Sequence, residues 1–198
     1  RVGLRRDRAL VAARAREAGL WSFPPDVWTV RGPSVIHDGV ISGELDIGAV
    51  GLSNLITMWD KTRGAGSVRG LSGMNVMPLL LVSSDAKIKA LADYTVQDRI
   101  ALPSVKVSMQ AMMLDILAAK TCGEDEYLKL DPNTVSMGYP AAAAGLLAGG
   151  AAFTSHFSVL PYQYFELARP GIHVVASSFD AIGPHSVSAL AATTSSPA

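Results

Sequence analysis

The sequence predicts an α/β protein built from two similar lobes. The first observation is an internal repeat, in which residues 32–53 align with residues 138–159 at an offset of 106 and three glycines coincide. Both copies place a β-branched run (27–30 and 134–135) before about nine helix-compatible residues, a glycine and a further strand. The strongly apolar segment 77–83 suits a strand buried on both faces. Strand, helix and strand in succession form a right-handed crossover, and two such units favour two lobes over one continuous sheet.

Length, composition and charge limit the class of protein. The 198 residues are 49% hydrophobic and 7% aromatic, which is enough to bury the core of one large domain or two small lobes. Lys+Arg and Asp+Glu both number 17, and the arginines near the N-terminus suit a solvated helix face, so we do not expect a nucleic-acid partner. Cys122 is the only cysteine in the sequence, which excludes an intrachain disulfide and a cysteine-based metal site.

Neither a membrane span nor a signal peptide is predicted. The apolar segment 140–153 is shorter than the roughly 18 to 20 residues that a spanning helix needs, and glycines interrupt it, so we expect a buried helix followed by a strand. The arginine-rich start is not followed by the apolar core of a signal peptide. Two alternatives are a cytoplasmic protein and a processed or incomplete form of an exported one.

Capping residues and hydrophobic periodicity predict the remaining elements in chain order. Asp7 suits the N-cap of a helix over 7–20, and Ser108 suits the N-cap of a helix that runs to about residue 120 with its methionines in the core. The other expected elements are a turn at 23–26, strands at 27–30, 47–50, 99–102 and 172–177, helices at 54–61 and 161–168, a glycine-rich loop at 63–73, a surface turn and helix at 85–93, and a loop at 103–107.

An acidic pair, Glu44 and Asp46, raises the possibility of acid and base catalysis. Both residues fall in the link between the helix that ends near Gly43 and the strand at 47–50. In open α/β sheets the functional end of a strand is its carboxyl end, which is the opposite end. We therefore expect the ligand-facing end to be the segment 51–54 and assign no catalytic residue.

Five motifs follow one another over most of the chain. They are AREAGLW (15–21), SGELDIGAVG (42–51), KIKALADYT (87–95), RIALPSVKVSMQAMML (99–114) and AAAAGLLAGGAAFTSHFSVLPYQY (141–164). In order and spacing they resemble the substrate-binding proteins of ABC transporters of the nitrate/sulfonate/taurine (SsuA/THI5-like) family. The resemblance implies a type II periplasmic binding fold, in which two α/β lobes joined by two crossing strands close on a ligand in the cleft between them.

The resemblance also implies how the chain divides. Lobe one would comprise residues 1–80 and 175–198, lobe two residues 81–174, and the crossings would lie near 77–83 and 174–178. Two departures from the family stand out: the first four residues leave room for only a stub of the first strand, and residues 189–198 form a small-residue tail without a helix-length apolar pattern. We expect lobe one to be incomplete, as in a fragment, a degraded gene product or the ordered part of a longer chain.

Ligand-binding residues are expected where strands end and helices begin, because helix N-termini present free amides and a partial positive charge. Segments 51–54, 104–109 and 155–158 fit this description, and the segment just before the apolar strand is a weaker candidate. The expected residues are Gly51, Leu52, Ser53, Asn54, Met74, Ser104, Ser108, Met109, His156 and Phe157. Capping alone is the alternative for Ser53 and Ser108, a structural loop histidine is the alternative for His156, and His173 is expected to be structural.

The function that the resemblance implies is non-enzymatic capture of a small solute and its delivery to a membrane permease. Such a protein would be periplasmic and monomeric, without cofactor or metal, and its solute would be a sulfonate, nitrate or a neutral organic molecule. One alternative is an enzyme similar to thiamine-pyrimidine synthases, whose cysteine-rich motif this sequence lacks. Another is the effector-sensing domain of a regulator, for which residues 1–19 are too short to form a helix-turn-helix. A Ser-His-Asp hydrolase is not favoured, since no G-x-S-x-G motif occurs.

Overall fold

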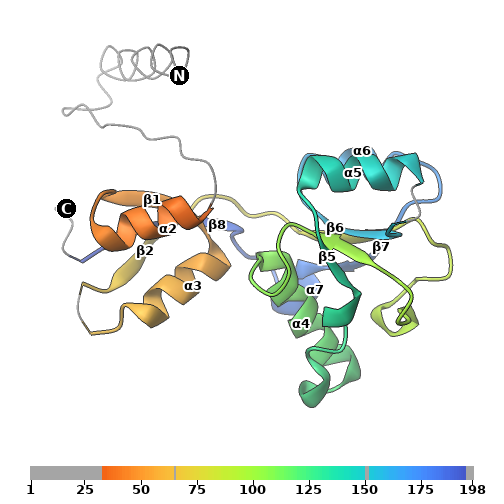
Figure 1. Cartoon of the computed structure of the whole chain (residues 1–198), viewed down its shortest axis with the longest axis horizontal. Helices are drawn as coiled ribbons and strands as arrows, with labels where there is room; N and C mark the ends of the chain where they lie inside the picture. The colour runs from red at the N-terminus through yellow and green to blue at the C-terminus, as the bar shows by residue number, and fades with distance from the viewer. Residues whose placement is uncertain (1–32, 65, 150–151, 195–198) are drawn as a thin grey trace, which may run out of the picture.

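The chain forms two α/β lobes that lie side by side (Figure 1). The computed structural model describes residues 33–64, 66–149 and 152–194, and the elements expected at 7–20, 23–26 and 27–30 lie outside these ranges. Lobe one contains α2 (Pro33–Ser42), β1 (Ile47–Gly51), α3 (Leu52–Lys61), β2 (Val68–Gly73) and β8 (Ser188–Thr193). Lobe two contains β3 (Leu80–Ser83), η1 (Leu91–Asp93), β4 (Ile100–Leu102), α4 (Met109–Cys122), η2 (Glu124–Glu126), η3 (Asp131–Asn133), β5 (Thr134–Ser136), α5 (Tyr139–Ala148), β6 (Ser155–Ser158), α6 (Tyr162–Leu167), β7 (His173–Ser177) and α7 (Ser178–Ile182).

Lobe one is a three-stranded sheet packed against two helices. Its order is β1-β8-β2, and both outer strands run antiparallel to β8. Its core consists of five buried residues drawn from α2, β1, α3, β2 and β8: Val40, Val50, Met58, Val68 and Ala191. Helix α2 approaches the sheet closely: a Cβ placed on Gly48 would lie only 2.6 Å from a Val40 methyl group. The small residues of this sheet therefore set the spacing between the sheet and its helices.

Lobe two is a five-stranded mixed sheet with helices on both faces (Figure 1). The order is β5-β4-β6-β3-β7, in which β4 runs parallel to β5 and β6 while β3 runs antiparallel to β6 and β7. Alternate strand residues enter two cores: Leu81, Leu102 and Phe157 pack with α4 and α7, whereas Val82 and Ala101 pack with α5. The predicted strand and helix at the start of the second repeat copy are confirmed as β5 and α5, whereas its second strand, β6, begins two residues later than the alignment with β1 predicts.

Most predicted elements are confirmed within two or three residues. These are α2, β1, α3, β3, β4, α4, α5, α6 and β7, and the stop signal of α5 is Gly149, which takes a left-handed conformation at φ 70°. The predicted link position of Glu44 and Asp46 is also confirmed, since both precede β1. His173 is satisfied structurally, with Nε2 2.6 Å from the Ile88 carbonyl oxygen.

The glycine-rich loop expected at 63–73 is wrong, because its second half is strand β2. This strand pairs antiparallel with β8, with a register irregularity between Gly70 and Ser72. A Cβ at Gly70 would lie 2.9 Å from a Leu55 methyl group of α3, so the glycine provides room for the helix instead of flexibility.

The small-residue tail expected from residue 189 onwards is also wrong. Residues 188–193 form β8, the central strand of the lobe-one sheet, and Ala189 and Ala191 are buried. Alanine has a weak preference for strands, but a position between closely packed neighbours has room for little else.

The helix expected at 85–93 is present only as the short helix η1. The Asp93 carboxylate accepts hydrogen bonds from the backbone N–H groups of Lys89 and Ala90, and these bonds fix a turn.

Two chain segments cross between the lobes, 74–79 on the way out and 183–187 on the way back (Figure 1). They run against each other: Val76 and Ser186 form a β-bridge, and the Asn75 side-chain oxygen accepts hydrogen bonds from the N–H groups of Val187 and Ser188 at 3.2 and 3.1 Å. β3 and β7 both belong to the lobe-two sheet, so the expected division between residues 174 and 175 falls inside β7. The two crossings are therefore held to each other by hydrogen bonds.

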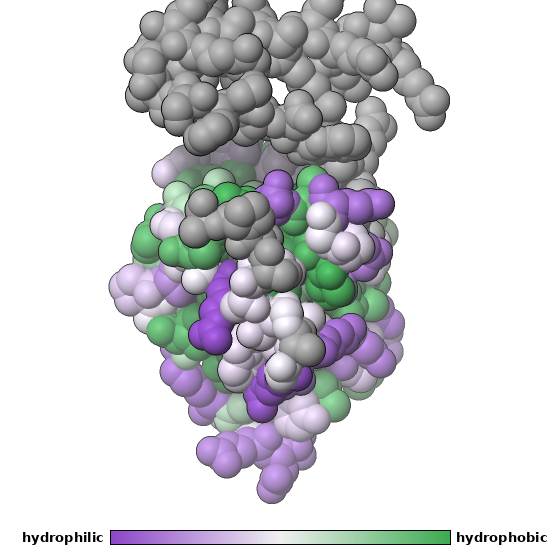
Figure 2. Space-filling model, turned by 90° about the vertical axis from the view of Figure 1, so that its left-hand side faces the viewer, coloured by the Kyte–Doolittle hydropathy of each residue, from purple (hydrophilic) through white to green (hydrophobic). Residues whose placement is uncertain are grey.

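The free end of lobe one carries apolar and polar surface side by side (Figure 2). The exposed large apolar side chains of this lobe include Ile41, Ile47, Ile56, Trp59 and Leu71. Among the described residues, every helix is too short or too polar to cross a lipid bilayer.

Candidate functional site

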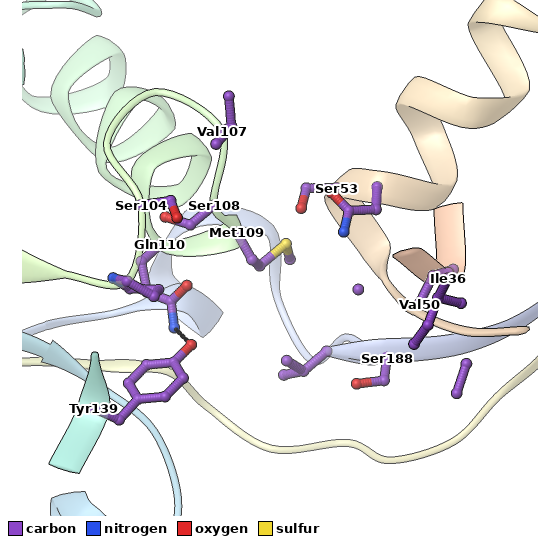
Figure 3. Close-up of a pocket in the computed structure, with 15 residues that line it drawn as sticks. Ile36, Val50, Ser53, Ser104, Val107, Ser108, Met109, Gln110, Tyr139 and Ser188 are labelled. Carbon is purple, nitrogen blue, oxygen red and sulfur yellow. Dashed lines mark hydrogen bonds between the residues drawn. The ribbon is translucent and has the colours of Figure 1, made fainter. Parts of the chain in front are cut away.

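A cavity of about 790 Å³ opens between the two lobes (Figure 3). Lobe one contributes the end of β1, the start of α3 and the start of β8, and lobe two contributes the loop after β4 and the starts of α4 and α5. The lining residues are Ile36, Ala49, Val50, Gly51, Ser53, Asn54, Pro103, Ser104, Val107, Ser108, Met109, Gln110, Tyr139, Val187 and Ser188. Its size lies within the range of small-molecule sites, about 300 to 1,000 Å³.

The lobe-one wall is built around the N-terminus of α3. Gly51 ends β1 and serves as the N-cap of α3 without any side-chain hydrogen bond, and the N–H of Leu52 donates to the Val187 carbonyl at 3.0 Å. The next residues, Ser53 and Asn54, line the cavity. Because first-turn N–H groups have no acceptor within their own helix, this wall presents donors and a partial positive charge. Since Gly51 is the N-cap, capping does not explain Ser53.

The lobe-two wall is built around the N-terminus of α4. Ser108 is the N-cap, and its hydroxyl oxygen accepts from the N–H of Ala111 at 3.2 Å, so the capping role of Ser108 is confirmed. The N–H of Ser108 in turn donates to the Ser104 carbonyl at 3.2 Å, which closes the loop between β4 and α4. Lys106 in this loop takes a left-handed conformation at φ 66°, and its side chain is exposed outside the cavity lining.

Gln110 and Tyr139 form a polar pair in the lobe-two wall (Figure 3). The Gln110 side-chain N–H donates to the Tyr139 hydroxyl at 2.6 Å. Burial raises the pKa of Tyr139, an effect that the hydrogen bond from Gln110 partly offsets, so the hydroxyl keeps its proton at neutral pH. Sequence reasoning missed both residues, although the rule applied to the other segments fits Tyr139, which starts a helix after the parallel strand β5.

Six of the ten expected residues line the cavity: Gly51, Ser53, Asn54, Ser104, Ser108 and Met109. Four lie elsewhere. Leu52 packs against the larger core of lobe two, and Met74 lies at the start of the outgoing crossing with about half of its side chain exposed. His156 and Phe157 are fully buried inside lobe two.

The predicted loop position of His156 and Phe157 is wrong, because residues 155–158 are the strand β6 itself. Phe157 points into the core shared with α4. His156 points to the opposite face, where its Nδ1 lies 2.6 Å from Oε1 of Glu166 on α6 and both side chains are fully buried. Neither residue reaches the cavity, although the His156 ring lies behind Tyr139 with ring centroids 6.2 Å apart.

The cavity wall offers polar and apolar contacts without a formal charge among the described lining residues. Hydroxyl and amide groups come from Ser53, Ser104 and Gln110, and apolar surface comes from Met109 and Val187. Such a wall can orient a small molecule by hydrogen bonds at one end and cover its apolar part at the other.

Comparison with known proteins places this arrangement in a known fold. No protein-family profile and no curated protein sequence matches the chain. Among solved structures, the chain is similar to the putative periplasmic sulfonate-binding protein SsuA of Methylobacillus flagellatus KT, with a TM-score of 0.57 and 20% identity over 81% of this chain and 46% of that one.

Two further SsuA structures agree. The aliphatic sulphonate binding protein of Escherichia coli gives a TM-score of 0.59 and 16% identity over 94% of this chain and 59% of that one. The alkanesulfonate-binding protein of Xanthomonas axonopodis pv. citri, bound to MOPS, gives a TM-score of 0.60 and 17% identity over 94% of this chain and 62% of that one. The chain has the type II periplasmic binding fold. It spans about half to three fifths of the length of these three neighbours.

Proposed function

We propose that this periplasmic binding fold serves as the solute-binding component of an ABC importer. It would capture a small organic solute in the cavity between the lobes, close on it, and present the closed form to a membrane permease. We further propose that it acts in the periplasm as a monomer and binds its solute without chemical conversion. The three similar structures are those of sulfonate-binding proteins, one of them putative and two of them described as periplasmic; this supports the proposal and makes alkanesulfonates the first solutes to test.

One observation carries this proposal: both lobes contribute to the wall of one cavity, and two paired crossings join those lobes. A molecule bound to both walls stabilises the arrangement in which the walls are close, which is hinge closure around a ligand. The volume of about 790 Å³ and the apolar surface of Met109 and Val187 favour an organic molecule over a bare inorganic anion such as nitrate.

The direct test is a thermal-shift screen of the full chain with MOPS, taurine, nitrate, small carboxylates and pyrimidines. A solute at 100 times its Kd stabilises the folded state by about 2.7 kcal/mol, which raises the Tm of a protein of this size by roughly 5 to 10 °C. If none of these solutes raises the Tm, solute binding of these classes is refuted.

A matched pair of variants locates the binding event. Ala49 lines the cavity, and Ile47 lies two residues earlier on the same strand with a side chain that is about half exposed outside the cavity. The indole of Ala49→Trp should fill the cavity and abolish the thermal shift, whereas Ile47→Trp should retain it. Loss of the shift in both variants, or in neither, would place the solute elsewhere.

A further inference from the structure

The hydrogen bond between Gln110 and Tyr139 has a defined direction. Gln110 is almost fully buried, and its side-chain N–H donates to the Tyr139 oxygen at 2.6 Å. A phenol has one proton to donate, and no hydrogen bond from the Tyr139 hydroxyl to an acceptor is seen among the described residues. The hydroxyl proton is therefore available at the cavity wall that Tyr139 forms (Figure 3).

The Tyr139 ring is held from behind by side chains that do not reach the cavity. Tyr162 of α6 stacks on it with ring centroids 6.2 Å apart and planes at 18°. His156 of β6 lies tilted against it at 6.2 Å, and its Nδ1 is tied to Glu166 at 2.6 Å with both side chains fully buried. Tyr139 itself begins α5, with Gly138 as an N-cap that contributes no side-chain hydrogen bond. A donor whose ring is fixed in this way loses little rotational freedom when it binds.

We propose that Tyr139 is a specificity-determining residue, whose hydroxyl donates to an oxygen acceptor on the head group of the solute. This inference rests on the proposed function. It narrows the solutes to those with a carboxylate, sulfonyl or carbonyl oxygen and excludes those whose polar end carries only donors.

The experiment combines affinity and spectroscopy on the full chain labelled with 13C at the tyrosine Cζ. The acceptor probes are propane-1-sulfonate and butyrate, and the donor-only probe is propylammonium. Tyr139→Phe identifies the resonance of Tyr139 and removes its hydroxyl alone. Tyr162→Phe is the matched control, because it removes one hydroxyl from the other member of the same ring stack outside the cavity lining.

The expected result is that an acceptor probe shifts the Tyr139 resonance while propylammonium does not. Tyr139→Phe should weaken binding of the acceptor probe at least about tenfold, as expected for a hydrogen bond to a charged group, and Tyr162→Phe should leave it within about twofold.

Two results would overturn the inference, and they differ. If an acceptor probe raises the Tm while the Tyr139 resonance stays in place and both variants bind equally, Tyr139 has no role but solute binding stands. If neither these probes nor the solutes of the thermal-shift screen raise the Tm or move any tyrosine resonance, the proposed function falls and the role of Tyr139 falls with it.

Discussion

Asp115 is a carboxylic acid whose place on α4 makes the stability of the protein depend on pH. Burial, and secondly the charge of Asp131, raise the pKa of Asp115 to about 6. Between about pH 4 and pH 6 the folded protein holds a proton that the unfolded chain has released, so stability falls as the pH rises through this range. Asp115→Asn should flatten that decline and stabilise the protein at pH 7 to 8. Urea denaturation at one-unit pH steps measures this, with exposed Asp125→Asn as the control; an unchanged decline in Asp115→Asn would contradict the assignment.

The His156–Glu166 pair should be among the most sensitive contacts in lobe two. Both side chains are fully buried, and His156 Nε2 and Glu166 Oε2 lack further partners among the described residues. Glu166→Ala leaves the histidine without its partner, and breaking a buried pair in this way costs about 3 to 5 kcal/mol. Urea denaturation should show that loss in the free energy of unfolding, and a smaller loss for Glu166→Gln. Asp60→Asn breaks the exposed Asp60–Arg63 pair and should cost less than about 1 kcal/mol. Equal effects of Glu166→Ala and Asp60→Asn would rule out a structural role for the buried pair.

Helix α2 sits so close to β1 that one glycine determines their packing. A Cβ at Gly48 would lie 2.6 and 2.7 Å from methyl groups of Val40 and Ile36, which are β-branched and stiff. A Cβ at Gly70 would meet only a terminal methyl of Leu55 at 2.9 Å, and a leucine can rotate away. Gly48→Ala should therefore destabilise the protein by about 1 to 3 kcal/mol, and Gly70→Ala by clearly less. Thermal denaturation of the two variants checks the ranking, which fails if Gly70→Ala is the more damaging change.

Elements with local signals could be predicted from the sequence, and elements specified by packing could not. The Ser108 cap and the apolar residues behind it predict α4, and the glycine after Leu147 and Ala148 predicts the end of α5. β8 carries no such signal, because a buried alanine such as Ala191 is selected by the narrow space between the sheet and its helices. From the sequence alone, a strand made of small residues such as β8 cannot be distinguished from a loop, because the neighbours that it packs against are unknown.

The candidate site shows the same division. The rule that helices begin at the ligand end of strands places Ser53, Ser104 and Ser108 in the cavity wall. It fails for His156 because the second repeat copy has a longer link: β1 starts four residues after Gly43, whereas β6 starts six residues after Gly149. Two extra residues convert the expected loop into the strand. The sequence does not predict Ser188 as a site residue, because the alanine-rich segment that follows it resembles a tail and not a strand.

The cores of the two lobes are separate clusters of buried residues, and besides the crossings only limited contact such as that of Leu52 with the lobe-two core is seen between them in the described residues, so the lobes need not unfold together. Among the described residues, lobe one has a single cluster of five buried apolar residues, whereas lobe two has two clusters on the two faces of a five-stranded sheet. Lobe one also exposes large side chains such as Ile47 and Leu71. Local opening free energies follow the density of buried apolar contacts. Hydrogen exchange should therefore be faster in β1, β2 and β8 than in β3, β4 and β6.

Variants that act on one lobe make this prediction decisive. Gly48→Ala strains only the lobe-one contact between α2 and β1, and Glu166→Ala removes a partner only from β6 in lobe two. Separate unfolding units require that Gly48→Ala accelerates exchange in β1, β2 and β8 alone. Glu166→Ala, which weakens the more stable lobe, should accelerate exchange in β3, β4 and β6 and leave the faster lobe-one amides unchanged. If either variant accelerates hydrogen exchange equally in all six strands, the two lobes unfold as one cooperative unit. The hydrogen bonds of Asn75 between the crossing segments would then couple the lobes. In that case the lobes would not move independently when the cavity closes.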